Sequence, residues 1–298
     1  MEGPLSSGQG ARWLSLVGIG EDGRAGLTAA AAAAIDGAAL VVGGERHLAL
    51  AAPIAAPTRA WPSPIHAAFP EILARRGWPV CVLATGDPFH HGVGVQLARL
   101  VAPEEMRVFP QPSAFALACA RLGWAQQDCA LVSLHGRALE RIIPHLQPGA
   151  RILALSWDGS TPEKVAVLLA ARGMGGSRLT VLEAMGGPRE RVRHAPAAAF
   201  DLAGIDPLNT LAVEVVADPD ADVLPLVPGL PDGLFESDGQ LTKAEVRAAT
   251  LAALAPRRGE LLWDVGAGSG SVGIEWALAH PDNRVLAVEA RAERASRS

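Results

Sequence analysis

The stretch from Val80 to Gly94, VCVLATGDPFHHGVG, places glycine, aspartate and histidine directly after a short apolar run. The run Val80–Leu83 has the length and β-branched character of a strand that is buried on both faces. Gly86, Asp87 and Pro88 then end it, because glycine admits a ligand to the backbone, aspartate bonds nearby amides and proline fixes φ. Ligands of open α/β sheets bind at such carboxyl ends of strands. The stretch predicts a ligand loop, although an ordinary turn between strand and helix fits the same residues.

A first glycine-rich turn lies close to the start of the chain. Gly18, Gly20 and Gly23 follow the expected strand Trp13–Val17, and an alanine-rich helix is expected from Thr28 to Ile35. Their spacing is GxGxxG, which in a dinucleotide-binding fold brings a pyrophosphate to the N-terminus of a helix. An NAD-dependent oxidoreductase is therefore one alternative, although the sequence shows no site that would handle a hydride.

A second glycine-rich turn follows the expected strand Leu261–Val265 and precedes an expected helix. Glu289 ends the next strand, Arg284–Val288, where a carboxylate can accept hydrogen bonds from ribose hydroxyls. The letters DVGAGSG favour S-adenosylmethionine over NAD, because an aspartate stands two residues before the first glycine. The residues of this turn expected to contact a cofactor are Asp264, Gly266, Gly268, Gly270 and Glu289.

Basic side chains occur in two other segments that follow expected strands. Arg46 and His47 follow the strand Ala39–Val42, and His135 and Arg137 follow a strand that ends near Leu134. Arginine is suited to bidentate pairing with carboxylates, so these residues are candidates for binding an acidic substrate. For Arg46 and His47 a solvated turn is the competing interpretation.

The elements that must position these residues alternate between strand and helix, which predicts an α/β protein with a mostly parallel sheet. Pro110–Pro112 reads as a joint between two such arrangements, and the proline-rich stretch after Val216 reads as a linker. The expected organisation is one α/β subdomain over residues 11–110, a second over 113–218, a linker over 219–231 and a Rossmann-like segment over 232–298. Thr161 is expected to be the N-cap of a helix that begins at Pro162.

Composition limits the classes of function. The net charge of −5 argues against binding of nucleic-acid phosphates. Cys81, Cys119 and Cys129 match neither a zinc pattern nor a disulfide framework, so no metal site is expected. Met1–Gly10 lacks the features of a signal peptide and no apolar run is long enough to span a membrane. We expect a cytoplasmic protein without membrane or nucleic-acid partners.

Seven segments, in their order and spacing, resemble the tetrapyrrole methylases over about Trp13 to Val216. They are VGIG, ATGDPFHHGVG, QPSAFALA, SLHGR, STPEKVAVLLAARG, EAMGGPRERV and PLNTLAVEV. The resemblance is strongest to members of cobalamin biosynthesis that methylate C-5 of a precorrin. The segment GLFESDGQLTKAEVRAATLAALAPRRGELLWDVGAGSG and the residues after it resemble the start of the decarboxylating C-15 methylase domain that such enzymes carry.

This resemblance implies S-adenosylmethionine bound in the cleft between two α/β subdomains, mostly through backbone groups, with no single catalytic base. Glu21 stands where many relatives have proline, so the contact expected there differs. The residues implicated in cofactor binding are Gly20, Glu21, Thr85, Gly86, Asp87, His90, Val93, Ser113, Ala114, Trp157 and Met185.

The same resemblance implies a polycarboxylate precorrin as substrate, facing Arg46, His47, His135 and Arg137, and a homodimer. Because the sequence ends at Ser298 after two strands of the second domain, C-15 methylation and decarboxylation are expected to be absent. A non-catalytic binding protein, with the last segment as an interaction tail, is the remaining alternative.

Overall fold

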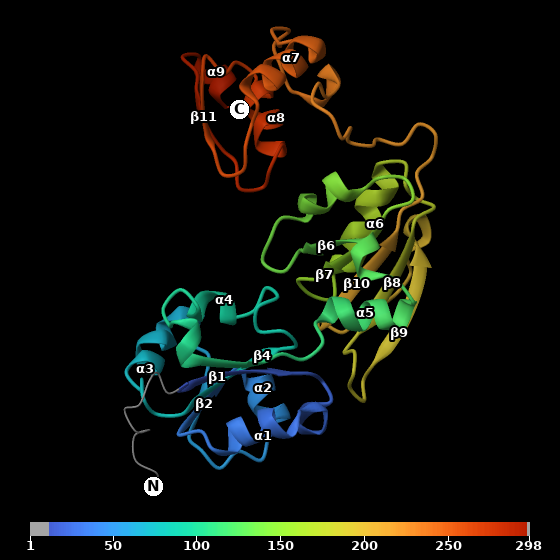
Figure 1. Ribbon diagram of the computed structural model, residues 1–298. Coiled ribbons are helices and arrows are strands. Elements are labelled where there is room, and N and C mark those ends of the chain that lie inside the picture. Colours follow the sequence, from blue (N-terminus) through green and yellow to red (C-terminus); the bar gives the residue numbers. More distant parts are fainter. Residues whose placement is uncertain (1–11, 297–298) are drawn as a thin grey trace. The chain divides into compact units, whose positions relative to one another are not determined.

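The computed structural model describes residues 12–296, and the chain folds as two compact units divided between Asp222 and Val223 (Figure 1). Unit 1 comprises the chain up to Asp222 and unit 2 the chain from Val223. Met1–Gly10, where the sequence shows no signal peptide, lies outside the described residues. Within residues 12–296, no helix has the length and apolar character needed to cross a bilayer.

The first sheet of unit 1 is parallel throughout and has the strand order β3-β2-β4-β1-β5. Its central strands are buried on both faces, as the apolar runs LSLVGI and VCVLA predict. Two separate hydrophobic clusters cover these faces, one around Leu16 and Val82, the other around Val17 and Leu83. The strands are β1 (Leu14–Ile19), β2 (Leu40–Gly43), β3 (Thr58–Ala60), β4 (Val80–Thr85) and β5 (Met106–Phe109).

Short helices connect these strands. Thr28 caps α1, since its Oγ1 accepts a hydrogen bond from the Ala31 amide at 3.2 Å. Residues 65–73 form two short helical pieces, and β3 lies in the proline-rich stretch that precedes them. The helical pieces are η1 (Gly23–Gly26), α1 (Ala29–Asp36), α2 (Glu45–Leu50), η2 (Ile65–Ala68), α3 (Phe69–Leu73), α4 (Gly94–Leu97) and η3 (Pro103–Glu105).

The second sheet of unit 1 has the order β6-β7-β10-β8-β9 and is mixed. Only β6 and β7 are parallel, whereas β10 pairs antiparallel with both β7 and β8, and β9 pairs antiparallel with β8. The prediction of a mostly parallel fold therefore holds for the first sheet and is wrong for the second. A short loop joins β8 to β9 without a helix, and such a connection produces antiparallel neighbours. The strands are β6 (Cys129–Ser133), β7 (Arg151–Leu155), β8 (Arg178–Glu183), β9 (Arg191–Pro196) and β10 (Asn209–Glu214).

Helices of the second sheet begin at polar residues. Ser113 caps α5 (Ala114–Leu122), because its Oγ accepts a hydrogen bond from the Ala116 amide at 3.2 Å. In α6 (Thr161–Ala171) the N-cap is Ser160 rather than the predicted Thr161, whose hydroxyl instead accepts from the amides of Trp157 and Asp158. The segment after Ala138 is the 3-10 helix η5 (Leu139–His145), in which Pro144 removes a backbone donor.

Unit 2 contains two parallel strands, β11 (Leu261–Val265) and β12 (Arg284–Val288), as the sequence predicts. The buried Arg247 of α7 (Ala244–Leu254) pairs with Glu275 of α8 (Ser271–Leu278) at 2.8 Å. The same carboxylate accepts hydrogen bonds from the amides of Gly229 and Leu230. The last residues of the expected linker are therefore fixed to unit 2, whereas Asp218 and Asp222 bond to the backbone of unit 1.

Candidate cofactor and substrate site

At Gly86, the end of β4 contacts the joint that connects the two sheets of unit 1. The Gly86 amide donates to the Ile19 carbonyl at 3.2 Å, and its carbonyl accepts from the Gln111 amide at 3.1 Å. Gly86 has a φ of +56°, and a Cβ atom there would lie 2.8 Å from the carbonyl oxygen of Pro112. Only glycine satisfies both conditions, so the predicted ligand loop is held by backbone contacts that a side chain would break.

The loop after Gly86 rests against α5. The Asp87 carboxylate accepts a hydrogen bond from the Phe89 amide at 2.8 Å, and the Asp87 carbonyl accepts from the His90 amide at 3.1 Å. The ring of His90 lies 5.0 Å from the ring of Phe115. Predicted residues Thr85, Gly86, Asp87, His90, Ser113 and Ala114 are thus brought into one region, where the carboxyl end of β4 meets the N-terminus of α5.

Arg46 and His47 lie in α2 and not in a turn at the end of a strand as predicted. Arg46 donates to the hydroxyl of Thr85 at 2.9 Å and forms an ion pair with Glu21. His47 accepts from the Gly44 amide at Nδ1, so its Nε2 carries the proton and donates to the same Thr85 hydroxyl at 2.8 Å. Burial, with a contribution from Arg46, lowers the pKa of His47 to about 4. The neutral imidazole of His47 and the paired guanidinium of Arg46 both bond to Thr85 at the end of β4.

Glu21 joins the first sheet to the loop between β8 and β9. Its side chain is only 9% exposed, and it pairs with Arg46 on one oxygen and with Arg189 on the other, at 3.3 Å. Arg189 also pairs with Asp206. A Cβ atom on Gly187 would lie 2.6 Å from the Cβ of Glu21, so this loop approaches the turn after β1 closely. The carboxylate of Glu21 therefore links the two subdomains of unit 1.

The loop after β8 forms another side of the region. Met185 is 8% exposed and packs in the same cluster as Phe115, so it lies beneath α5 more than it lines an open wall. Gly186 has a φ of +87°, and a Cβ atom there would meet nothing within 4 Å. Ala184, a non-glycine residue, has a φ of 42°. Strained backbone beside open space is typical of loops that bind ligands.

For three other predicted cofactor residues, the contacts given by the structure are with other parts of the chain and not with Gly86 or Asp87. Val93 packs its side chain against the core around Leu97. Trp157 is 58% exposed, and its amide donates to the Thr161 hydroxyl at the start of α6. Gly20 lies within the turn after β1, where its carbonyl accepts from the Gly23 amide at 3.0 Å.

A cluster of basic side chains lies near the tip of the ligand loop. The guanidinium groups of Arg137 and Arg141 lie close enough to His91 to lower the pKa of its imidazole, after the larger effect of burial and that of His90. Arg137 belongs to the exposed turn after β6 with His135, as predicted, whereas His91 and Arg141 were missed. The consecutive histidines of the loop were the available signal.

The first GxGxxG motif does not have the geometry of a dinucleotide site. A Cβ atom on Gly18 would lie 1.7 Å from the Gly86 carbonyl oxygen, so this glycine accommodates the protein's own loop. Gly23 lies in η1, and α1 begins only at Ala29, so the third glycine does not open the helix. Because these glycines serve packing within the chain, the first motif gives no support to NAD binding.

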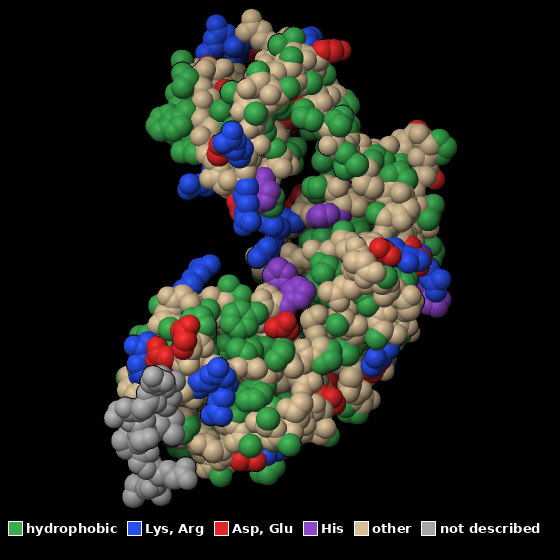
Figure 2. All heavy atoms as spheres, in the orientation of Figure 1, with side chains coloured by type: hydrophobic (Ala, Val, Ile, Leu, Met, Phe, Trp, Pro, Cys, Tyr) green, Lys and Arg blue, Asp and Glu red, His purple; other side chains and the backbone are tan. Residues whose placement is uncertain are grey.

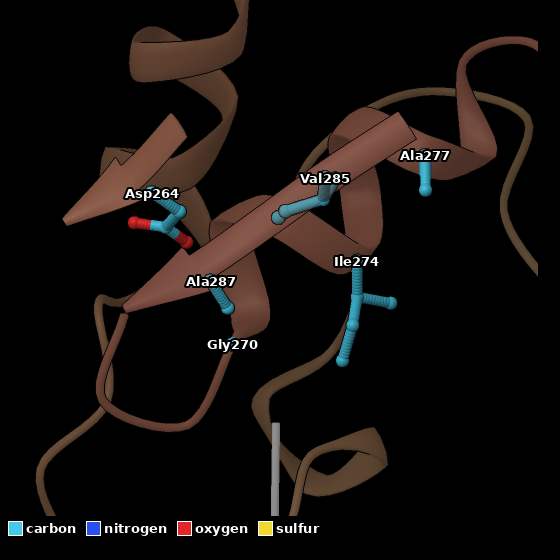
Figure 3. A pocket seen from close by; sticks show the side chains of 7 residues that line it. Asp264, Gly270, Ile274, Ala277, Val285 and Ala287 are labelled. Carbon is cyan, nitrogen blue, oxygen red and sulfur yellow. The ribbon is translucent and has the colours of Figure 1, made fainter. Parts of the chain in front are cut away.

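Unit 2 has a separate glycine turn beside a cavity of about 350 Å³ (Figure 3). Asp264, Gly270, Ile274, Val285 and Ala287 are among its lining residues. The Oδ2 atom of Asp264 is buried without a hydrogen-bond partner.

Glu289 accepts from the amides of Gly268 and Arg291, both at 2.9 Å. These two backbone hydrogen bonds lower the pKa of Glu289. The expected ribose acceptor thus caps its own glycine turn in this structure, in which Gly266 and Gly268 both have positive φ.

The region around Gly86 fits S-adenosylmethionine in the character of its groups. It offers backbone amides and carbonyls from several loops, and open space in front of Gly186. The half-buried Asp87 supplies one negative charge for a ligand that carries a sulfonium and an ammonium group.

Comparison with known proteins agrees with this geometry. Residues 14–201 match the model of the Tetrapyrrole (Corrin/Porphyrin) Methylases, and residues 233–298 match a Precorrin methyltransferase domain. A Precorrin-6Y C(5,15)-methyltransferase [decarboxylating] from Sinorhizobium sp is 56% identical over 286 residues, which cover 96% of this chain and 69% of that protein. A Cobalt-precorrin-7 C(5)-methyltransferase from Salmonella typhimurium is 34% identical over 191 residues, covering 63% of this chain and 92% of that protein.

Solved structures show the same fold. The crystal structure of a cobalamin biosynthesis precorrin-6Y methylase from Archaeoglobus fulgidus has a TM-score of 0.54 and 25% identity, and the match covers 68% of this chain and 98% of that one. The family match spans both sheets of unit 1 and the loops that meet at Gly86. The chain therefore belongs to the tetrapyrrole methylase family and is a methyltransferase that uses S-adenosylmethionine.

Proposed function

We propose that unit 1 transfers a methyl group from S-adenosylmethionine to C-5 of a precorrin in cobalamin biosynthesis. Methylation at C-5 is common to the names of the Sinorhizobium and Salmonella relatives. The Salmonella relative matches 191 residues of this chain, about the extent of the tetrapyrrole methylase match. The observation that carries the proposal is the backbone contact of Gly86 with the joint before α5. This contact brings backbone groups of both subdomains to one loop.

The proposed reaction does not require a strong general acid or general base from the protein. The nucleophilic C-5 forms a carbon–carbon bond to the methyl group, and the carbon–sulfur bond breaks to leave a neutral thioether while a proton leaves the substrate. S-adenosylmethionine supplies the activated methyl group when bound. The residues of the chain then act by holding the two reactants at attack distance and limiting water, which is the main source of rate in such a transfer.

Within this scheme the loop residues have separate tasks. Gly86, Ser113 and Ala114 provide a close backbone surface for the nucleoside. Asp87 stabilises the turn through the Phe89 amide. The pairing of Arg46 with Glu21 removes Arg46 from the expected carboxylate contacts, so His135 and Arg137 remain the predicted residues for the acidic substrate.

The role of unit 2 is a separate part of the proposal. Its match to a precorrin methyltransferase domain and its open glycine turn support a second nucleoside-binding region at Asp264 and Gly266–Gly270. The longer relatives are named for both C-5 and C-15 methylation and for decarboxylation. The expected absence of C-15 methylation from this chain stays a prediction, as does a dimer, and release of CO₂ from the substrate measures the former.

The test uses the full chain with radiolabelled S-adenosylmethionine and a precorrin substrate. Asp87→Ala removes an acceptor from the turn, and we expect binding of the cofactor to weaken by about 1 to 3 kcal/mol. Asp201→Ala, an exposed aspartate of the same unit, is the matched control and should change nothing.

Calorimetry with S-adenosylmethionine and with NAD separates the two cofactor classes directly. Wild-type chain that binds S-adenosylmethionine and labels C-5 supports the proposal. A chain that binds NAD instead, or cofactor binding that Asp87→Ala and Gly86→Val both leave unchanged, would place the site elsewhere.

A further inference from the structure

Arginines near the ligand loop fall into two groups. Arg46 and Arg189 share Glu21, and Arg121 pairs with Glu190 at 2.6 Å. Arg137 and Arg141 differ, because within residues 12–296 neither has a carboxylate partner within 4.0 Å. Two guanidinium groups without a counter-charge therefore stand at the edge of the proposed active site.

A histidine of the ligand loop completes this group. His91 is exposed, its ring centroid lies 5.2 Å from that of His90, and its backbone has a φ of 59°. This left-handed conformation is uncommon for a residue with a side chain and costs free energy, and such strain gathers at ligand-binding segments. The loop thus presents the His91 side chain from a backbone conformation that histidine adopts more often than most residues with a side chain.

The electrostatic balance of the cluster is unfavourable without a ligand. Burial, His90, Arg137 and Arg141 all lower the pKa of His91, in that order. Arg141 also contributes to a lowered pKa of His145, after burial. The nearest acid along η5, Glu140, is exposed and forms no ion pair among the described residues. The carboxylate of Asp87, which lies on the same loop as His91, accepts a hydrogen bond from the Phe89 amide.

An anion would reverse this balance. A carboxylate placed among these groups gains charge-assisted hydrogen bonds from one or both guanidiniums and relieves their mutual repulsion. Figure 2 shows histidine and basic side chains gathered on one face of unit 1, where the ligand loop after β4 is close to the turn after β6. The proposed substrate carries several carboxylates around its macrocycle, which is the ligand chemistry that such a cluster recognises.

We propose that His91, Arg137 and Arg141 form a carboxylate clamp that binds one acidic side chain of the tetrapyrrole and sets its orientation over the ligand loop. This inference rests on the proposed function for the identity of the substrate. His91 reaches the carboxylate from the loop that also contacts the cofactor, whereas the two arginines reach it from the second subdomain. The clamp therefore couples the position of the substrate to the position of Asp87 and His90.

The test measures binding of uroporphyrin, an octacarboxylated tetrapyrrole, to the full chain by fluorescence quenching. We expect the Arg137→Ala/Arg141→Ala double variant to bind at least tenfold more weakly, with a smaller dependence on salt concentration. His91→Asn, which keeps a residue that tolerates left-handed backbone, should bind about threefold to tenfold more weakly. Arg107→Ala is the matched control, because the backbone of Arg107 pairs with Ser15 near the amino end of β1, away from the ligand loop.

Cofactor affinity is the second readout, and all four chains should bind S-adenosylmethionine equally. Unchanged uroporphyrin affinity in the double variant, or an equal loss in Arg107→Ala, would overturn the clamp. If the clamp variants also lose cofactor binding, the loop has been deformed and the inference fails. A wild-type chain that binds uroporphyrin through these residues but methylates no precorrin would remove the proposed function and leave the clamp in place.

Discussion

Two turns of this molecule carry the same GxGxxG spacing and are used differently. After β1, the space beside Gly18 is filled by the chain itself, since a Cβ atom would lie 1.7 Å from the Gly86 carbonyl oxygen. After β11, the motif is Gly268, Gly270 and Gly273, and a Cβ atom on Gly268 would lie no closer than 4.0 Å to the nearest atom, the Gly266 carbonyl oxygen. The neighbouring cavity is lined by Asp264 and Gly270. One turn is a packing contact and the other is open to a ligand, so glycine spacing alone does not identify a nucleotide site.

The acidic residues near the two turns, Glu21 and Glu289, differ in the same way, since one contacts distant segments and the other contacts its own turn. Glu21 is buried and paired with Arg46 and Arg189 from two other segments. Glu289 accepts only from backbone amides of its own region, at Gly268 and Arg291. The difference follows from the neighbours, because β1 lies between β4 and β5, whereas the described residues of unit 2 give β11 one partner, β12. A covered turn becomes part of the core, and an uncovered one keeps its backbone groups accessible.

The largest expected effect is that of Gly18→Ala. The added Cβ would collide with the backbone of Gly86 and Gln111, which cannot move without separating β4 from the joint. We expect unit 1 to lose at least about 3 kcal/mol of stability, at the upper end of overpacking effects. Hydrogen exchange resolved by peptide measures each unit separately, and unit 2 should be unchanged. Gly37→Ala is the control, because Gly37 has an ordinary φ of −87° and its nearest neighbour to an added Cβ is the Ala33 carbonyl oxygen at 3.3 Å. Equal losses in the two variants would contradict the packing role of Gly18.

An intermediate effect is expected for Glu21→Gln. The substitution keeps the shape of the side chain but leaves Arg46 and Arg189 without their shared counter-charge. Both arginines are at least a third exposed, so water replaces part of the pairing and the expected loss is about 1 to 2 kcal/mol. Faster exchange should appear in the turn after β1 and in the loop between β8 and β9. Glu45→Gln, an exposed acid at the start of α2, serves as the control, and a matching effect there would refute the link between subdomains.

The smallest expected effect is that of Gly266→Ala. Space is available for the methyl group, so the cost is limited to placing alanine at a φ of +83°, about 1 to 2 kcal/mol in unit 2. Exchange in unit 1 should not change. A loss of stability as large as that of Gly18→Ala would mean that the second turn is also a packing contact, and the contrast between the two turns would disappear.

The sequence by itself determined much of the local structure. Apolar runs of the right length gave β1, β4, β11 and β12 within one or two residues, and Thr28 was identifiable as a helix start. The GDP loop was found from Gly86, Asp87 and Pro88, because these residue types have conformational properties that do not depend on distant parts of the chain. Motif order then indicated the family, which the comparisons confirm.

Only the tertiary structure decided which of these residues are available to a ligand. Arg46 and Arg137 look alike in the sequence, since each follows a strand, yet Arg46 is paired with Glu21 and Arg137 has no carboxylate within 4.0 Å among residues 12–296. The mixture of parallel and antiparallel strands in the second sheet likewise depends on segments far apart in the chain. So does the contact between Gly86 and the joint before α5. Local propensity acts over a few residues, whereas burial and charge pairing depend on which distant groups become neighbours when the chain folds.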